Sequence, residues 1–303
     1  MVSGPLGQDR RSPAIANRRC SDYSGSLPRI GKEADRRGVM GVNLDNGPAT
    51  PKPSLLHRLA RPTGYVLSPL LITQGRIARS RRGRLPNAPL PWSGTIDGPS
   101  PIKLIGLGDS TIAGVGVDDP MLGLASQFAK AVYAHTSRGV VWDSYGERGI
   151  TTSQLHEDYL PRALAEHQDV DIALVSIGAN DAKNLQSAKA AVGWTIKTLD
   201  SLHQAYPEAL IIVSSVPAFH LFESLPQPLR SIMAAHGQAI ERAARPLVES
   251  RRYALMSPPP PDYPMGFFAS DGFHPSAEGY RIWAQFALDH AVGRGGLDHL
   301  RAR

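Results

Sequence analysis

Short apolar runs alternate with longer amphipathic stretches over the C-terminal two thirds of the chain. The short runs have the length of buried strands and lie at residues 102–107, 140–142, 172–177, 210–216 and, more weakly, 253–256. The longer stretches space their apolar residues at a helical period and lie at residues 122–135, 153–167, 188–206, 229–250 and 277–292. Because strands that alternate with helices of this length form βαβ units, the pattern predicts an α/β domain over residues 101–303, with a parallel sheet of about five strands covered on both faces.

The first hundred residues follow a different pattern. Residues 1–53 are rich in Gly, Pro, Ser and Arg and show no apolar period. Such a segment cannot bury enough surface to offset its ordering entropy, so we predict a disordered basic tail, within which Met40 is an alternative start of translation. Residues 54–100 continue as a basic extension, with apolar residues followed by an arginine cluster, and then as a Pro- and Gly-rich linker from residue 85.

The positive charge of the chain is concentrated in this N-terminal part. Residues 1–101 carry 16 Lys and Arg against 6 Asp and Glu, whereas residues 102–303 carry 17 against 21. The basic part lacks interleaved aromatic residues and any recognised nucleic-acid module, so no nucleic-acid partner is expected. We expect the apolar residues of segment 54–84 to pack on the main domain, with weak contact to a membrane surface as the alternative.

Cysteine content and hydropathy restrict the class of protein further. The single cysteine, Cys20, excludes an internal disulfide and a cysteine-based metal site. No apolar run approaches the ~18 residues of a membrane-spanning helix, and arginines interrupt the N-terminus where a signal peptide needs an apolar core. We therefore expect a cytoplasmic protein, whose oligomeric state the sequence leaves open.

Polar residues gather where the predicted strands end and before the last helix. These blocks are residues 108–110, 146–152, 178–181 and 271–275. The carboxyl ends of parallel strands share one rim of the sheet, where α/β proteins bind their ligands. We therefore expect the first three blocks to converge on that rim, and the fourth to reach it from the loop before the closing helix.

Together the blocks contain the groups that acyl transfer requires. Ser110 is the candidate nucleophile, and His274 is the base that takes its proton. Asp271 precedes His274 by three residues, close enough for its carboxylate to orient the imidazole. The side-chain amide of Asn180 and the backbone N–H groups of Gly149 and Ser110 are candidate donors to the oxyanion. This chemistry uses no metal and no cofactor, and we expect none.

These blocks resemble the signatures of the SGNH (GDSL-type) hydrolase family, named for its Ser, Gly, Asn and His residues. The sequence shows GDS at residues 108–110, GxND at 178–181 and DxxH at 271–274, in the order of that family. The resemblance covers roughly residues 102–292. It implies a flavodoxin-like three-layer α/β/α sandwich and a Ser-His-Asp triad that cleaves acyl esters or thioesters, as in esterases, lipases and lysophospholipases.

The remaining site candidates lie in the second block and beside the fourth. Gly149 is taken as the glycine of the family's second block in preference to Gly146, because the Ile-Thr-Thr that follows it is similar to that block. Arg148 is a candidate for binding an anionic substrate group, with a solvated arginine as the other interpretation. Phe267 and Phe268 are candidates for the wall of an acyl-chain site, because they are apolar and close in sequence to the DxxH block.

Other functions remain open at this point. An acyltransferase or a carbohydrate O-acetyl esterase would use the same triad. In a different class, a non-catalytic nucleotide- or ligand-binding α/β domain would share the fold. The segment 106–111 begins like GxGxxG, but it lacks the third glycine and Asp109 would face a pyrophosphate. Since that interpretation does not explain Asp271 and His274, we expect a small-molecule ester or thioester as the substrate.

Overall fold

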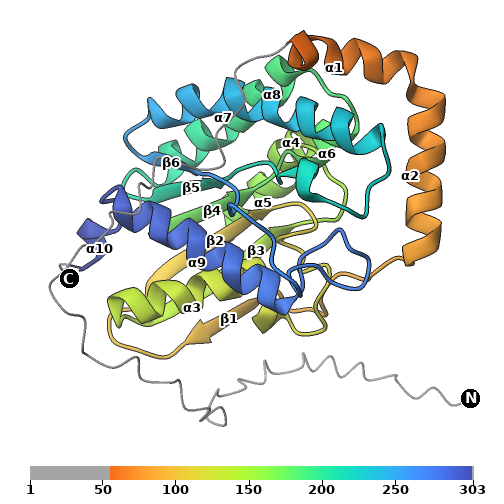
Figure 1. Cartoon of the computed structure of the whole chain (residues 1–303). Coiled ribbons are helices and arrows are strands. Elements are labelled where there is room, and N and C mark those ends of the chain that lie inside the picture. Colours follow the sequence, from red (N-terminus) through yellow and green to blue (C-terminus); the bar gives the residue numbers. More distant parts are fainter. Residues whose placement is uncertain (1–54, 302–303) are drawn as a thin grey trace, which may run out of the picture. The chain divides into compact units, whose positions relative to one another are not determined.

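A six-stranded sheet forms the centre of the part of the chain that the structure describes (Figure 1). The computed structural model describes residues 55–301, except for the side chains of residues 55–58, 79, 81, 82 and 301. These residues all belong to one unit, Val42–Arg303. The tail predicted at residues 1–53 lies outside the described residues. The strands are β1 (Ser93–Ile96), β2 (Ile102–Gly108), β3 (Val140–Gly146), β4 (Ile172–Ser176), β5 (Leu210–Ser214) and β6 (Ala254–Ser257).

Helices connect the strands and precede the sheet. The longer ones are α1 (Leu55–Val66), α2 (Ser68–Arg82), α3 (Leu124–Thr136), α7 (Ala188–Ala205), α8 (Leu229–Glu249) and α9 (Ala277–Gly293). The shorter ones are α4 (Thr152–Gln154), α5 (Leu160–Glu166), α6 (Ala179–Lys183) and α10 (Asp298–Arg301). A π-helical turn, Leu155–Tyr159, joins α4 to α5. The helix predicted at 153–167 is therefore present as one continuous helical segment with a π turn inside it, and Pro161 stands in the first turn of α5, where the ring is tolerated.

The central strands are apolar on both sides because each side faces a helical layer. Leu104 of β2 and Leu174 of β4 belong to the core that packs under α3 and α9. Ile105, Leu107 and Val175 point the other way, into the core shared with α5, α7 and α8. Figure 1 shows α3 and α9 together on one face of the sheet and α7 and α8 on the other face.

The strand order determines where a ligand binds. The order is β1-β3-β2-β4-β5-β6, and β2 to β6 are parallel. The five parallel strands, numbered along the chain, therefore follow the order 2-1-3-4-5, which is flavodoxin-like. The chain leaves β2 toward β3 on one side and continues to β4 on the other, so the loops after β2 and β4 diverge and leave a crevice between them. The predicted α/β/α fold is confirmed.

Strand β1 is the element that the apolar pattern did not predict. It lies in the segment predicted as an extended linker and pairs antiparallel with the edge strand β3. The strand is only four residues long, Ser-Gly-Thr-Ile, and therefore has no apolar run from which it could be predicted. The glycine has a packing role, because a Cβ on Gly94 would approach Nε1 of Trp142 to 3.0 Å. Only the pairing with β3 makes this segment a strand.

The basic extension packs on the domain through α1, which agrees with the packing expected for segment 54–84. Arg61 donates from Nε to the carbonyl oxygen of Leu185 at 3.0 Å, and Gly64 leaves the space that Leu185 and Ile232 occupy. Leu70 of α2 remains exposed, and contact of this segment with a membrane surface stays a prediction. Within residues 55–301, no helix combines the length and the hydropathy needed to cross a membrane.

Candidate active site

Ser110 lies on a tight turn directly after β2. A Cβ on Gly108 would overlap the carbonyl oxygen of Ser176 on β4, so only glycine fits at this point of the strand. The turn is then held by backbone bonds: the N–H of Asp109 donates to Ser176 O at 3.1 Å, and the N–H of Val115 donates to Ser110 O at 3.0 Å. These contacts set Ser110 at the crevice between the β2 and β4 loops.

Asp109 braces this turn from inside. Its Oδ1 accepts the backbone N–H of Thr111 at 3.2 Å, and its Oδ2 accepts Nδ2 of Asn180 at 3.2 Å. Burial raises the pKa of Asp109 to about 6, although the Thr111 N–H and the charge of His274 act in the opposite direction. The carboxylate therefore joins the β2 turn to α6.

Asp271 and His274 form a hydrogen-bonded pair in the loop before α9. Nδ1 of His274 lies 2.6 Å from Oδ2 of Asp271. The other carboxylate oxygen accepts the backbone N–H groups of Phe273 and His274, each at 2.9 Å. Burial alone would raise the pKa of Asp271, but these hydrogen bonds outweigh burial and lower it. The carboxylate thus stays ionised and orients the imidazole.

The loop before α9 packs against the Ser110 turn. A Cβ on Gly116 would overlap the carbonyl oxygen of Pro275, and the hydroxyl of Tyr280 on α9 donates to Val115 O at 2.7 Å. Burial raises the pKa of Tyr280 well above its usual value, and the carboxylates of Asp109 and Asp271 raise it further. Tyr280 therefore lies near both carboxylates and joins the two loops.

The hydroxyl of Ser110 and the imidazole of His274 make no hydrogen bond with each other within the described residues. Their loops nevertheless touch, and the charge of His274 acts on Asp109, the residue before Ser110. Catalytic hydrogen bonds are often long without substrate and tighten when it binds. The loops that carry Ser110 and His274 are thus in contact, and among the described residues the hydrogen bond between the two side chains is not formed.

Asn180 is placed on the same rim by the first turn of α6. Gly178 precedes it with φ 113°, a conformation that favours glycine. Nδ2 of Asn180 also donates to Ile150 O at 3.0 Å. Nζ of Lys183, one turn further along α6, donates to Oδ1 of Asn180 at 2.6 Å. Lys183 was not among the residues expected at the site from the sequence, although its spacing of three residues from Asn180 is the signal that would have found it.

The structure separates the two glycines of the second block. Gly146 is the last residue of β3, and a Cβ there would overlap the carbonyl oxygen of Gly108. Gly149 lies in the following loop with φ 87°, and a Cβ there would meet nothing within 4 Å. Neither the N–H of Gly149 nor that of Ser110 donates to another group in the part of the chain that the structure describes. The first glycine is needed for strand packing, and the second has an N–H available to a ligand.

Asp181, next to Asn180, ties the β3 and β4 loops together. Its carboxylate accepts the backbone N–H of Thr152 at 3.0 Å and the Thr152 hydroxyl at 2.8 Å. Burial raises the pKa of Asp181, while the two Thr152 bonds act against this. Both oxygens are thus engaged in holding the rim, which is a structural role.

The candidate substrate-binding residues differ in their surroundings. The Phe267 side chain is 1% exposed and stacks on Tyr263 within the core, with ring centroids 4.3 Å apart. It therefore offers no surface to a substrate in this structure, because its ring is used in packing. Phe268 is half-buried and meets Phe222 edge to face, with centroids 4.9 Å apart. The backbone N–H of Arg148 donates to Glu147 at 2.7 Å.

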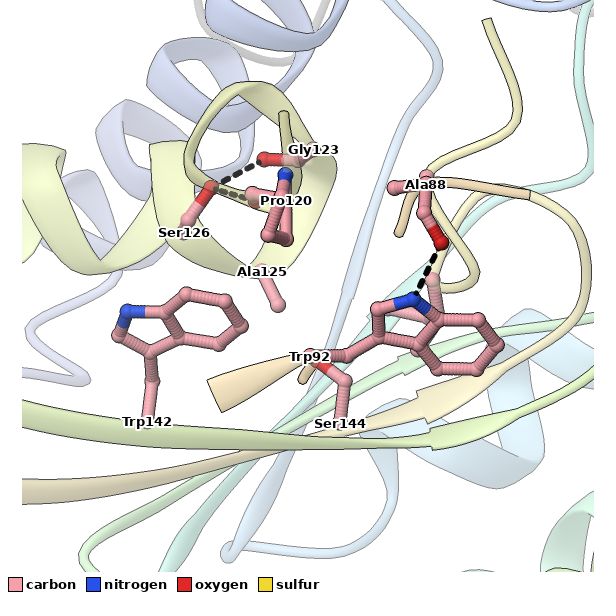
Figure 2. A pocket seen from close by; sticks show the side chains of 10 residues that line it. Ala88, Trp92, Pro120, Gly123, Ala125, Ser126, Trp142 and Ser144 are labelled. Carbon is pink, nitrogen blue, oxygen red and sulfur yellow. Dashed lines mark hydrogen bonds between the residues drawn. The ribbon is translucent and has the colours of Figure 1, made fainter. Parts of the chain in front are cut away.

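Two cavities lie near the Ser110 turn. Figure 2 shows the smaller, lined by Trp142 and Ser144 of β3 and by Trp92, whose indole N–H donates to Ala88 O at 2.8 Å. Its volume of about 10 Å³ is that of about one water molecule, so it is no substrate site. The larger cavity, of about 590 Å³, is a groove whose lining includes Leu85 and Leu122. Within residues 55–301, no cluster of three or more His, Cys, Asp or Glu residues is placed to hold a metal ion.

A serine on a strand-end turn, a buried Asp–His pair and backbone N–H groups without an acceptor at one rim of a parallel sheet are the groups that a serine hydrolase uses. The sequence model of the GDSL-like Lipase/Acylhydrolase family matches residues 107–282. That match covers more than half of the chain, and the protein belongs to this family, which confirms the resemblance noted in the sequence.

Individual relatives agree with this assignment. The chain is 27% identical over 202 residues to the GDSL-like esterase Rv1075c of Mycobacterium tuberculosis; the match covers 61% of this chain and 60% of that protein, less than two thirds of its length. The fold is similar to that of the lipase Lip_vut3 from a goat rumen metagenome, with TM-score 0.52, 15% identity, and coverage of 64% of this chain and 99% of that one. It is also similar to a Clostridium thermocellum family 3 carbohydrate esterase, with TM-score 0.52, 16% identity, and coverage of 67% and 100%.

Proposed function

We propose that this protein is an esterase that cleaves small acyl esters or thioesters through an acyl-enzyme on Ser110. The observation that carries the proposal is the ionised Asp271, hydrogen-bonded to His274 at 2.6 Å in a loop that packs against the Ser110 turn. A carboxylate in this position fixes the imidazole tautomer, so Nε2 is left as the base for the serine hydroxyl. Membership of a lipase and acylhydrolase family supports the same chemistry.

The proposed reaction has two steps. In the first, His274 takes the proton of Ser110 as its oxygen attacks the acyl carbon, and then gives that proton to the leaving alcohol or thiol. In the second, water attacks the acyl-enzyme, His274 takes a proton from the water, and that proton returns to the serine oxygen as the acid leaves. Asp271 stabilises the imidazolium that forms in each step.

The oxyanion of each tetrahedral intermediate would be bound by three donors. They are the backbone N–H groups of Ser110 and Gly149 and the side-chain amide of Asn180. The two backbone groups have no protein partner within the described residues. Both N–H groups of the third donate to Asp109 and Ile150 in this structure, so one of them has to leave its partner, or be shared with it, when the oxyanion forms. Losing one such donor typically costs about 100- to 1000-fold in rate.

Labelling with a fluorophosphonate probe tests the nucleophile. We expect mass spectrometry of the labelled protein to find the phosphonate on the peptide that contains Ser110, since only an activated serine reacts at a useful rate. Ser110→Ala should lose both the label and p-nitrophenyl acetate hydrolysis while keeping its thermal unfolding temperature. Ser201→Ala, on α7, is the matched control and should keep both the labelling of Ser110 and the hydrolysis of p-nitrophenyl acetate. Label on another serine would contradict the assignment.

Product analysis decides between water and an alcohol as the acyl acceptor. An acyltransferase would use the same residues but form a new ester when an alcohol is added. We expect free acid to remain the main product at millimolar alcohol concentrations. Acetylated sugars belong in the same screen, because the carbohydrate O-acetyl esterase alternative predicts acetate release from them.

A further inference from the structure

The groove of about 590 Å³ has walls from three separate parts of the chain. One wall is the linker around Leu85 and Pro89, which precedes the part of the chain that the family model matches. The second is the end of the Ser110 turn, from Gly116 to Asp118, and the third includes Ala277, the first residue of α9. A volume of this size is in the range of small-molecule sites.

The linker wall is held in place by hydrogen bonds. The backbone N–H of Ala88 donates to Ala113 O at 3.0 Å, which joins the linker to the Ser110 turn. Asn87 donates from Nδ2 to Glu147 at 3.0 Å, in the loop that carries Gly149. The bond from Trp92 to Ala88, visible in Figure 2, closes the linker on itself. The groove is therefore formed before any ligand arrives.

The groove adjoins the two loops that carry the candidate nucleophile and the imidazole. Ala277 follows His274 by three residues, and a chain spans at most about 3.6 Å per residue, so the two are within about 11 Å. Gly116 contacts the residue after His274, because a Cβ on it would overlap Pro275 O. The N–H of Val115, next to Gly116, donates to Ser110 O. Both proposed catalytic loops thus continue into the groove.

We propose that this groove binds the alcohol part of the ester substrate, as a neutral apolar chain. The inference rests on the proposed function: His274 must give its proton to the leaving oxygen, so the alcohol leaves on the imidazole side. Leu85, Val117 and Leu122 supply apolar walls for that chain. Asp118 is exposed and lines the same groove, which disfavours an anionic alcohol.

Two series of esters test the inference. In the first, acetate esters carry straight alcohols from ethyl to octyl, and in the second, p-nitrophenyl esters carry acyl chains from two to eight carbons. We expect kcat/KM to rise by up to about fourfold per methylene in the alcohol series, as burial of a methylene allows. Leu85→Asp should lower the ratio of kcat/KM for octyl acetate to kcat/KM for ethyl acetate at least tenfold. Leu90→Asp, at a linker position that is 78% exposed, is the matched control and should leave that ratio unchanged.

Each outcome has a separate meaning. An unchanged ratio of octyl to ethyl acetate in Leu85→Asp overturns the inference while ethyl acetate hydrolysis upholds the proposed function. If kcat/KM of Leu85→Asp falls only for the p-nitrophenyl esters with long acyl chains, the inference is also overturned, because the groove would then hold the acyl chain. A wild-type protein that hydrolyses neither these esters nor the corresponding thioesters refutes the proposed function, and the inference with it. If Leu85→Asp does not fold, Leu85→Ala should still lower the octyl to ethyl ratio about threefold, and an unchanged ratio would refute the inference.

Discussion

Removing the amine of Lys183 should slow the chemical step without weakening substrate binding. Nζ of Lys183 donates to Oδ1 of Asn180 at 2.6 Å, so it determines which end of the amide faces the rim. Nδ2 then points to Asp109 and Ile150. In Lys183→Met, the amide loses one of the three contacts that distinguish its two ends, and part of the population presents oxygen where the oxyanion needs a donor.

The expected loss can be bounded from these contacts. A hydrogen bond to a charged group contributes about 1.5–3 kcal/mol, and because Lys183 is exposed, screening by solvent reduces that figure. The two bonds made by Nδ2 of Asn180 remain and favour the original orientation. Complete loss of an oxyanion donor would cost about 100- to 1000-fold. We therefore expect kcat to fall about 5- to 30-fold and KM to stay within twofold.

Steady-state hydrolysis of p-nitrophenyl acetate measures both constants. Lys183→Arg keeps a charged donor at this position and should recover most of kcat. Lys189→Met, which removes an exposed lysine at the start of α7, controls for the loss of one positive charge. The reasoning is refuted if kcat of Lys183→Met stays within twofold of wild type, or if the loss appears in KM alone.

Three further predictions concern the candidate site. Asp271→Asn should lower kcat about 10³- to 10⁴-fold in the same assay, because an amide does not hold the imidazole in the tautomer that the 2.6 Å bond selects; a loss below tenfold would contradict the proposed triad. Gly149→Ala should fold with a strain of about 1–2 kcal/mol from its φ of 87°, and activity should fall because relief of that strain displaces the N–H proposed to bind the oxyanion. Gly146→Ala should unfold at a clearly lower temperature because its Cβ overlaps Gly108; the reverse order of stabilities would be evidence against this assignment. Because the pKa of Asp109 is raised from 3.8 to about 6, the folded protein holds that proton to higher pH than the unfolded chain, so wild-type stability should fall as pH rises from about 4 to 6. Thermal unfolding of Asp109→Asn across this range should lack that contribution, and equal slopes for the two proteins would disprove it.

Much of the fold was predictable from local patterns. Five buried strands and the helices between them follow from apolar runs and helical periods, because each parallel strand is covered on both faces. Strand β1 and the π turn within the helix at 153–167 were not predictable in this way. The first depends on pairing with β3, and the second on how one turn of chain adapts around Pro161.

The sequence predicted which residues belong to the candidate site better than it predicted what those residues contact. Ser110, Asn180 and the Asp271–His274 pair stand in short motifs, and the pair is close enough in sequence to meet without help from the rest of the fold. Phe267 was chosen for its composition and position, but the packing of Tyr263 over it buries the ring. Whether an aromatic side chain faces a ligand or a core depends on its neighbours, which a sequence position does not state.

The sequence by itself determined the chemical groups of this protein and their order, because a serine, an amide and an Asp–His pair are properties of short segments. Tertiary structure alone decided that the loops carrying them meet at the crevice beside β2, that Lys183 holds Asn180, and that the linker forms one wall of a groove. The physical reason is the range of the interactions. Motifs and periods depend on neighbours along the chain, whereas the rim of a sheet is assembled from strands whose order is set by packing between distant residues.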